Sequence, residues 1–536
     1  MHSRILLGLG IFGLAGCGVF GSDGGDGPAP AVAAADPPAR DEGDAAAAQQ
    51  LPDGAPPPAV GRPDTSELTE MFGVFVTPTG TADGDGTRQH PFATITAGIE
   101  RVKDLKLRVY VCGGTYKEAI SLVNAVSVIG SLSCDGGMWK TGGARTILAA
   151  PTSPAVRAKD IALVTRLDGL DVLAPAGAAG SPNSIALIAE NASALTVANS
   201  KLIAAKAFDG VDGTTAIQLS RGMTLAGADG LELSNLLANP VVGPQPHLGG
   251  AGGVGSCVGA AGHDGGNGKQ GGSGATEICT GHLHPITGVY DWTWEAYVRA
   301  GVTFSRSDGA AGASTPGATG SDGSSASKIG SFTPDGYSAA DGTDGADGTP
   351  GPGGSGGNGA PTTIGTSCGA SGTGSNPAAG KIIYDATGAG GGAGGCPGLA
   401  GKAGTGGGAS IAALVFASPG LSLTTCELVA GDAGKGGSGA FPSAPTSGGV
   451  PGWAPPGTTF ATAGGPGGRA GFSGNGAGGP SIALAHTGGE IVVAPDTHLT
   501  AGNAGAGVPD RSTVINGSTV TIPASVAGTA MPILAF

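Results

Sequence analysis

The segment SIALIAENASALTVANSKLIAA, which begins at Ser184, has two similar copies later in this chain, and the three align without a gap. The second copy, SIAALVFASPGLSLTTCELVAG, begins at Ser410, and the third, SIALAHTGGEIVVAPDTHLTAG, begins at Ser481. Short apolar runs separated by small or turn-forming residues predict strands, and recurrence at a fixed length predicts one coil of a parallel β-solenoid per copy. The alignment gives four shared slots: Ile185, Ile411 and Ile482; Leu195, Leu421 and Val492; Leu202, Leu428 and Leu499; Ala204, Ala430 and Ala501.

The segment that begins near Phe72 predicts a strand over 74–77, an amphipathic helix over 91–103 and a strand over 108–112. It resembles the start of pectin-lyase-like right-handed β-helix proteins, namely a domain of unknown function that opens many secreted bacterial members. The resemblance implies an all-β, right-handed parallel β-helix with an N-terminal capping helix, and the activity varies across that family. The matching residues are Gly84-Asp85-Gly86-Thr87, Pro91-Phe92-Ala93-Thr94-Ile95, Gly114-Thr115-Tyr116 and Glu118.

The N-terminus has the pattern of an export signal. A short basic start is followed by an apolar run that is too short to span a bilayer, and then by Leu14-Ala15-Gly16-Cys17. This tetrad resembles the lipobox of bacterial lipoproteins, which implies lipidation of Cys17 and a membrane anchor. The alternative is an ordinary secretory signal with an incidental cysteine.

Residues 18–70 have almost no apolar periodicity and are rich in Pro, Ala, Gly and Asp. Ten acidic side chains against two arginines give this stretch a net charge of −8, which is more than half of the −14 of the whole chain. Such a composition predicts a disordered tether. Because no basic stripe occurs elsewhere, a nucleic-acid partner is not expected.

Cysteine usage fits an oxidising compartment. Cys112 and Cys134 lie near the ends of successive predicted strands, one coil apart, so they are predicted to form a disulfide. Tentative pairs are Cys257 with Cys279 and Cys368 with Cys396, although spacing alone does not fix connectivity. Cys426 is left over and occupies the slot of Ser200 and Thr497, as a small solenoid residue would.

Glycine recurs at every third position in several stretches after His247. This is the period of the polyproline II helix, in which glycine lets neighbouring chains approach closely. Packed helices of this kind are favoured over a disordered linker, and the runs are predicted to be insertions at one corner of the solenoid. The overall composition resembles the glycine-rich PGRS-type repeat proteins. The longest runs are 259–274, 342–357 and 392–407.

The sequence therefore divides into seven stretches. They are a signal with its lipobox (1–17), a tether (18–70), the N-terminal part of the β-helix (71–240), a glycine-rich insertion (241–408), one coil (409–430), a second insertion (431–479) and the C-terminal part (480–536).

Candidates for chemistry are few. Asp168 and Asp171 with Arg166 are the closest approach to the calcium-binding acids and base of pectate-lyase relatives, and Asp168-Gly169 reads first as a turn. Asp83 and Asp85 could ligate calcium, but the ligand set is incomplete, so no cofactor is indicated. His282 and His284 lack a third metal ligand, and no zinc motif occurs. Three aromatic residues in the long insertion form either a local hydrophobic anchor or a glycan-stacking surface: Trp292, Trp294 and Tyr297.

These patterns predict an exported lipoprotein, attached by its lipid to the outer membrane or cell surface, with a non-catalytic structural, adhesive or glycan-binding role. Its expected partners are the membrane and polysaccharide or other envelope components. The alternative is a polysaccharide lyase or hydrolase of the same fold, which would need three or more carboxylates and a base on one exposed face.

Overall fold

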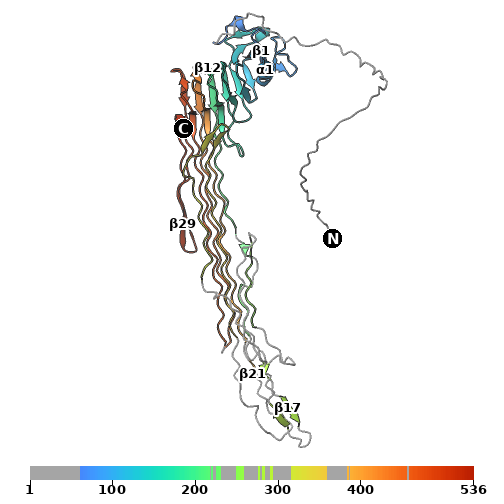
Figure 1. The fold of residues 1–536 in the computed structure, drawn as a ribbon, viewed down its shortest axis with the longest axis vertical. Helices are drawn as coiled ribbons and strands as arrows, with labels where there is room; N and C mark the ends of the chain where they lie inside the picture. The colour runs from blue at the N-terminus through green and yellow to red at the C-terminus, as the bar shows by residue number, and fades with distance from the viewer. Residues whose placement is uncertain are drawn as a thin grey trace, which may run out of the picture. The chain divides into compact units, whose positions relative to one another are not determined.

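The computed structural model describes residues 61–217, 219–220, 225–230, 249–258, 276–277, 280–283, 290–293, 315–358, 383–384, 387–455 and 458–536. The described residues belong to one compact unit, which is dominated by three parallel sheets (Figure 1). The chain is therefore all-β, as predicted, with one α-helix among the described residues.

From β2 onward, each passage of the chain contributes a strand to sheet A, then to sheet B, then to sheet C. Sheet A contains β1 (Gly73–Thr81), β2 (Arg108–Cys112), β5 (Val128–Ser133), β9 (Thr165–Asp168), β12 (Leu195–Ala198), β23 (Ser422–Thr424) and β26 (Val492–Val493), with β6 (Lys140–Thr141) antiparallel to β5. Sheet B contains β3 (Gly114–Tyr116), β7 (Thr146–Ala149), β10 (Leu170–Leu173), β13 (Lys201–Ala204), β24 (Glu427–Ala430) and β27 (His498–Thr500). Sheet C contains β4 (Ile120–Leu122), β8 (Val156–Lys159), β11 (Ser184–Glu190), β22 (Ser410–Phe416), β25 (Ser481–Thr487) and β30 (Ala530–Ala535).

The three sequence copies pair as neighbours. In sheet C, Ile185 pairs with Ile411 and Ile411 with Ile482, and in sheet B, Leu428 pairs with both Leu202 and Leu499. The predicted stacking of these distant segments is confirmed. Inward leucines and valines from successive strands form columns, and these columns build a continuous core between the sheets.

The predicted slot of Leu195, Leu421 and Val492 is wrong in its third copy. Val492 pairs with Ser422 rather than with Leu421, and its side chain is 53% exposed, whereas Ile491 joins the core beside Leu421. The turn before β26 contains two adjacent glycines with positive φ, Gly488 and Gly489. The equivalent turn before β23 contains one glycine with positive φ, Gly420. A tighter turn shifts the register of this strand by one residue.

Helix α1 (Ile95–Val102) is shorter than the predicted 91–103, because Thr94 is its N-cap and residues 91–93 precede the helix. Its apolar face packs on the first strands of sheet A. The Glu118 carboxylate accepts hydrogen bonds from the N–H groups of Ile95 and Thr96, at 2.7 and 2.9 Å. Glu118, which the sequence singled out in this segment, therefore has a structural role: it satisfies free N–H groups at the helix N-terminus.

The folded part begins before residue 71, so the predicted end of the tether is wrong. The 3-10 helix Thr65–Glu67 and its flanks lie on sheet A, where Leu68 is buried at 1% exposure. Arg62, further back, forms an ion pair with the buried Asp168. Charge and low apolar periodicity indicated disorder here, but a few ion pairs and one leucine are enough to hold the segment.

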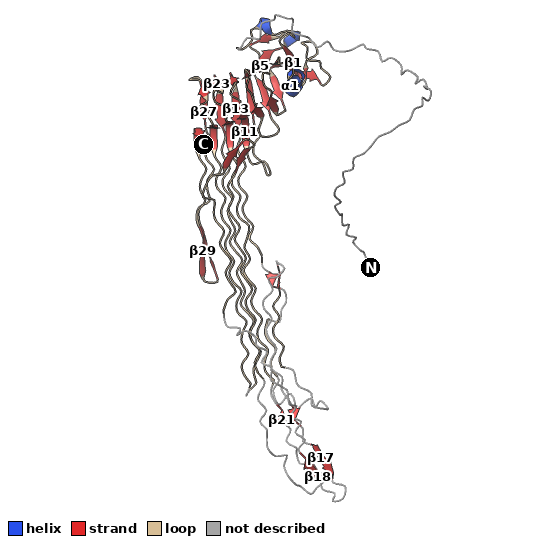
Figure 2. Cartoon of the chain, in the orientation of Figure 1, coloured by secondary structure: helices blue, strands red, loops and turns tan. Residues whose placement is uncertain are grey.

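The glycine-rich tracts leave the sheets at one place. Each begins after a strand of sheet B and returns to a strand of sheet C, between β13 and β22, between β24 and β25, and between β27 and β30. Figure 2 draws them as tan chains that lie side by side. The prediction of insertions at one corner is confirmed, but the first starts after Ala204 rather than at residue 241, since the described residues 207–213 already bond to a neighbouring tract.

Neighbouring tracts are joined by hydrogen bonds between backbones. Glycine N–H groups spaced three residues apart, at 465, 468, 471 and 474, donate to carbonyl groups of the facing tract at 352, 349, 346 and 343. A methyl group at Gly468 would lie 2.0 Å from the Ala318 carbonyl oxygen, so no larger residue fits there. The described tracts are therefore packed on one another.

Five short antiparallel pairs accompany the tracts. They are β14 (Leu219–Ser220) with β15 (Cys257–Val258), β16 (Thr276–Glu277) with β21 (Ile383–Tyr384), β17 (Thr280–Leu283) with β18 (Tyr290–Thr293), β19 (Ser331–Thr333) with β20 (Gly336–Ser338), and β28 (Arg511–Ile515) with β29 (Ser518–Ile522). Tyr337 of β20 packs on Ile185, Ile411 and Ile482, and so covers the outer face of sheet C. The pairing of β14 with β15 corrects the predicted continuation of the solenoid to residue 240.

Candidate functional site

A cavity of about 580 Å³ opens beside the N-terminal strands, and we call it the cap pocket. Its walls come from the end of β1, from the loop that leads to α1, and from the turn after β5. The lining residues are Thr77, Thr79, Gly80, Thr81, Arg88, Gln89, His90, Pro91, Cys134, Gly137 and Trp139.

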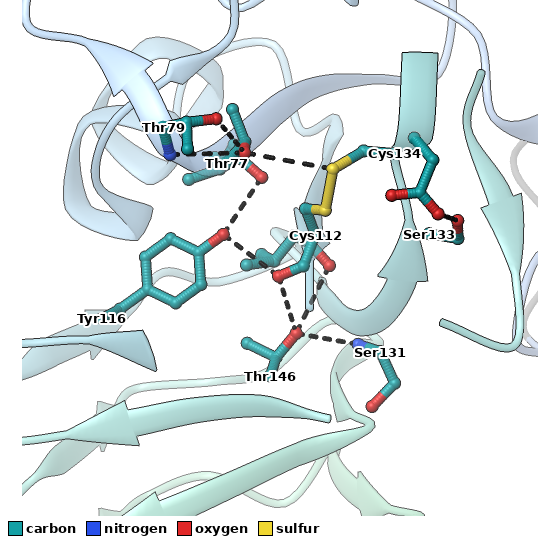
Figure 3. Close-up of a disulfide and its surroundings, with 11 residues drawn as sticks. Thr77, Thr79, Cys112, Tyr116, Ser131, Ser133, Cys134 and Thr146 are labelled. Carbon is teal, nitrogen blue, oxygen red and sulfur yellow. Dashed lines mark hydrogen bonds between the residues drawn. A yellow bond between two sulfur atoms is a disulfide. The ribbon is translucent and has the colours of Figure 1, made fainter. Parts of the chain in front are cut away.

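One wall of the cap pocket is a disulfide. Cys112 is the last residue of β2 and Cys134 follows the adjacent strand β5, so the two Cα atoms lie 5.8 Å apart and the sulfurs are bonded (Figure 3). This is the pair that the sequence predicted. The Cys134 sulfur lies 3.9 Å from the Thr77 hydroxyl, at the base of the pocket.

Buried hydrogen bonds hold the backbone under the disulfide. The Tyr116 and Thr146 hydroxyls both donate to the Cys112 carbonyl oxygen, each at 3.1 Å, and Thr146 accepts the Ser131 N–H at 2.9 Å (Figure 3). Burial raises the pKa of Tyr116, so its hydroxyl stays a donor at neutral pH. The base of the cap pocket is therefore rigid.

The Arg88 guanidinium in the pocket wall is already neutralised. It meets the Glu70 carboxylate through Nε and Nη2, at 3.2 and 3.1 Å, and lies 5.6 Å from the centre of the Phe75 ring. Burial opposes ionisation of Glu70, but hydrogen bonds from its own main chain and from Arg88 leave its pKa below the usual value. The pair thus contributes no net charge to the pocket.

In the predicted cluster of Arg166, Asp168 and Asp171, both carboxylates form ion pairs with arginines. Asp168 is fully buried, and its two oxygens bond to Arg62 and to Arg166, each at 2.6 Å. Asp171 pairs instead with Arg145, at 2.5 Å. With both oxygens occupied, Asp168 joins residue 62 to sheet A and has no free lone pairs directed at solvent.

Asp83 and Asp85 behave as turn residues. The Thr87 main chain and hydroxyl lower the pKa of Asp85 by hydrogen bonding, and the Thr81 hydroxyl does the same for Asp83. Within the described ranges, no group of three or more His, Cys, Asp or Glu side chains could hold a metal ion.

A second disulfide joins Cys257 to Cys396, with Cα atoms 5.8 Å apart. The predicted pairs of Cys257 with Cys279 and of Cys368 with Cys396 are therefore wrong, and Cys279 and Cys368 lie outside the described residues. The bond links two tracts that lie side by side but are separated by 139 residues in the chain. Sequence spacing could not indicate this pair, because adjacency here depends on how the tracts return.

Cys426 is a buried free thiol, as expected of a small residue in its slot. Its sulfur donates to the carbonyl groups of Val197 and Thr424, at 3.3 and 3.2 Å. Burial raises the pKa of this thiol, so it is held in the unreactive protonated form.

Other predicted residues are not placed by the structure. Trp292 and His282 lie on the paired strands β18 and β17, whose side chains are not described. Four predicted residues lie outside the described ranges altogether: Cys17, His284, Trp294 and Tyr297.

Sequence reasoning missed the cap pocket and one further hollow. A cleft of about 510 Å³ lies where sheets A and B meet, and most of its charges are paired, as in the contact of Lys201 with Glu427 at 2.5 Å. In sequence, the threonines of TPTGT, at the end of the first strand, are the only sign of the cap pocket, and they also fit a simple turn.

Among the residues that the structure describes, no helix has the length and apolar character needed to cross a membrane. Comparison with family models, with curated proteins and with solved structures found no match for this chain.

Proposed function

We propose that sheets A, B and C form a right-handed parallel β-helix of the pectin-lyase-like type and that the tracts are polyglycine II-like helices. The constant order in which the chain visits the three sheets supports the first part. Donors at every third residue support the second, because three residues per turn place them on one side of a chain.

We further propose that the protein is exported and anchored by a lipid on Cys17, and that it acts without catalysis in a structural, adhesive or glycan-binding role at the cell envelope. The packing of the tracts carries this proposal. A linker needs no partner, whereas these glycine tracts bond to one another and return each time to the same sheets. A fixed glycine bundle on a β-sheet support suits the display of the tract ends to an external partner.

The test compares the full-length chain with its Cys17→Ser variant in the native host. We expect the wild type to incorporate radiolabelled palmitate and to be found in the membrane fraction. The variant should do neither. The purified chain is then incubated with acidic and neutral polysaccharides, and no new chain ends are expected. Retention of the variant in the membrane would contradict the lipid anchor, and cleavage of a polysaccharide would establish the enzyme alternative instead.

A further inference from the structure

We propose that the cap pocket binds a neutral saccharide, held by the hydroxyls of Thr79 and Thr81 and by the Gln89 amide. The proposed function enters this inference at one point: a location at the cell envelope would supply the saccharide. The site is distinct from the aromatic residues of the long insertion that the sequence favoured for glycan contact.

The size of the cap pocket suits a disaccharide. Its volume of about 580 Å³ lies within the range of small-molecule sites. Thr77, one of the lining residues, is 7% exposed, so part of the pocket wall is shielded from water.

The charge in the pocket selects against ionised sugars. Arg88, the only arginine or lysine in the wall, is paired through two nitrogens with Glu70. An anionic ligand would have to compete with that carboxylate, and a cationic ligand would find no carboxylate among the lining residues. A neutral polyol has neither cost.

The polar groups match hydroxyl chemistry. Threonine hydroxyls and a glutamine amide both donate and accept hydrogen bonds, as sugar hydroxyls do. Thr79, Thr81 and Gln89 are exposed in the pocket wall. The Thr79 hydroxyl lies 3.2 Å from that of Thr77 and the Thr81 hydroxyl hydrogen-bonds to Asp83, so each keeps lone pairs with which to accept a hydrogen bond from a sugar hydroxyl. Trp139 also lines the pocket but is only 6% exposed, so it offers little ring surface for stacking on a sugar. We therefore expect weak binding, with a Kd of about 1 mM.

The pocket is formed before any ligand arrives. A methyl group on Gly80 would lie 2.4 Å from the Phe92 carbonyl oxygen, and one on Gly84 would lie 2.5 Å from that of Pro91. The loop thus packs backbone against backbone, and the disulfide fixes the opposite wall. Little ordering is needed on binding, which favours even a ligand that makes few contacts.

The experiment titrates the full-length chain, in detergent, with cellobiose and with N,N′-diacetylchitobiose while ligand-detected NMR follows binding. Digalacturonic acid is the charged comparison. We expect at least one neutral disaccharide to bind, and the double variant Thr79→Val with Thr81→Val to weaken that binding roughly tenfold, because two hydrogen-bonding groups are lost. The matched control is Thr115→Val, on the exposed side of β3 and outside the pocket, which should leave binding unchanged.

Three results would overturn the proposal: no binding of either neutral disaccharide at about 10 mM, equal binding by the double variant, or tighter binding of the acidic disaccharide. Both threonines are exposed, so the variant is expected to fold, and its unfolding midpoint is measured alongside. Loss of saccharide binding leaves the Cys17 experiment unaffected, so the two proposals fail separately.

Discussion

At the scale of single residues, charged side chains in this chain hold segments together. Asp168 has no exposed surface, and its two oxygens are bonded by two arginines and by the Asn199 amide. A buried carboxylate costs free energy unless its oxygens are bonded, so each partner matters. Arg62 is the partner that comes from outside the sheets.

We predict that Arg62→Met lowers the free energy of unfolding by about 1 to 3 kcal/mol, because one oxygen of a buried carboxylate loses its cation. The measurement is urea unfolding, together with hydrogen exchange of residues 61–70. Lys103→Met is the control, since its pair with Glu100 is exposed and is expected to contribute little to stability. Equal effects of the two substitutions would contradict this role of Arg62.

Gly468 is the clearest test of close packing between tracts. We predict that Gly468→Ala costs about 2 to 3 kcal/mol and exposes the neighbouring amides to exchange, because its methyl group would collide with a backbone carbonyl that cannot move alone. Gly61→Ala, where nothing lies within 4 Å, is the control and should be nearly neutral. If both variants keep full amide protection at 465–474, the tracts are less closely packed than described.

At the scale of elements, α1 depends on an acid from a later part of the chain. We predict that Glu118→Ala weakens the helix by about 1 to 2 kcal/mol, because the first N–H groups lose their acceptor while Thr94 still caps Ala97. Hydrogen exchange over residues 92–102 measures the change. Glu118→Gln retains one acceptor and should fall between the wild type and the alanine variant, an order that a purely steric role would not produce.

The tracts use aspartate side chains as acceptors for neighbouring backbones. Asp344 accepts the Ala403 N–H at 2.7 Å and pairs with Lys402 at 2.8 Å. Hydrogen bonds from Lys402 first, and then from Ala403, lower the pKa of this carboxyl below 3.8. Its contribution to stability is therefore present above that pH and is lost as pH falls through the lower pKa of the folded state.

We predict that the difference in stability between the wild type and Asp344→Asn shrinks as pH falls from about 6 to about 2. The asparagine keeps an oxygen for the Ala403 N–H but does not titrate. Thermal unfolding midpoints across this range measure the effect. A difference that stays constant with pH would show that the charge of Asp344 contributes nothing.

The last strand of sheet C limits further pairing. The pairing of β25 with β30 joins Ile482 to Met531 and Leu484 to Ile533, and residue 532 between them has no partner in β25. Residue 532 is proline, which has no N–H to offer. An exposed edge strand of this kind is protected from adding another strand.

At the scale of the whole unit, the two disulfides constrain loops of very different length. Cys112 and Cys134 are 22 residues apart, whereas Cys257 and Cys396 are 139 apart. Because the entropy removed from the unfolded chain grows with loop length, we predict that Cys257→Ala with Cys396→Ala destabilises by about 1 to 2 kcal/mol more than Cys112→Ala with Cys134→Ala. Urea unfolding of the two double variants tests this, and the reverse order would indicate that local packing outweighs loop closure.

Which tracts become neighbours follows from where glycine falls. In the tract 342–357, every third residue is a glycine, and these glycines face the tract 459–474. In the tract 458–480 there are two phases: Gly464 and Gly467 face residues 393–396, whereas Gly465 and Gly468 face 315–318. A second set of glycines at every third position therefore marks a tract with a second close neighbour. This signal is missed when only one such set is followed in each tract.

The sequence by itself determined the strands and most of their register, because each repeated leucine or isoleucine must lie above its equivalent to keep the core columns continuous. It also indicated the disulfide between adjacent strands, where one coil brings the cysteines together. Only the tertiary structure decided the Cys257–Cys396 bond, the burial of Asp168 and the cap pocket. These features depend on which loops and tracts, tens to hundreds of residues apart in the chain, become neighbours in the fold. A local sequence period does not predict such long-range contacts.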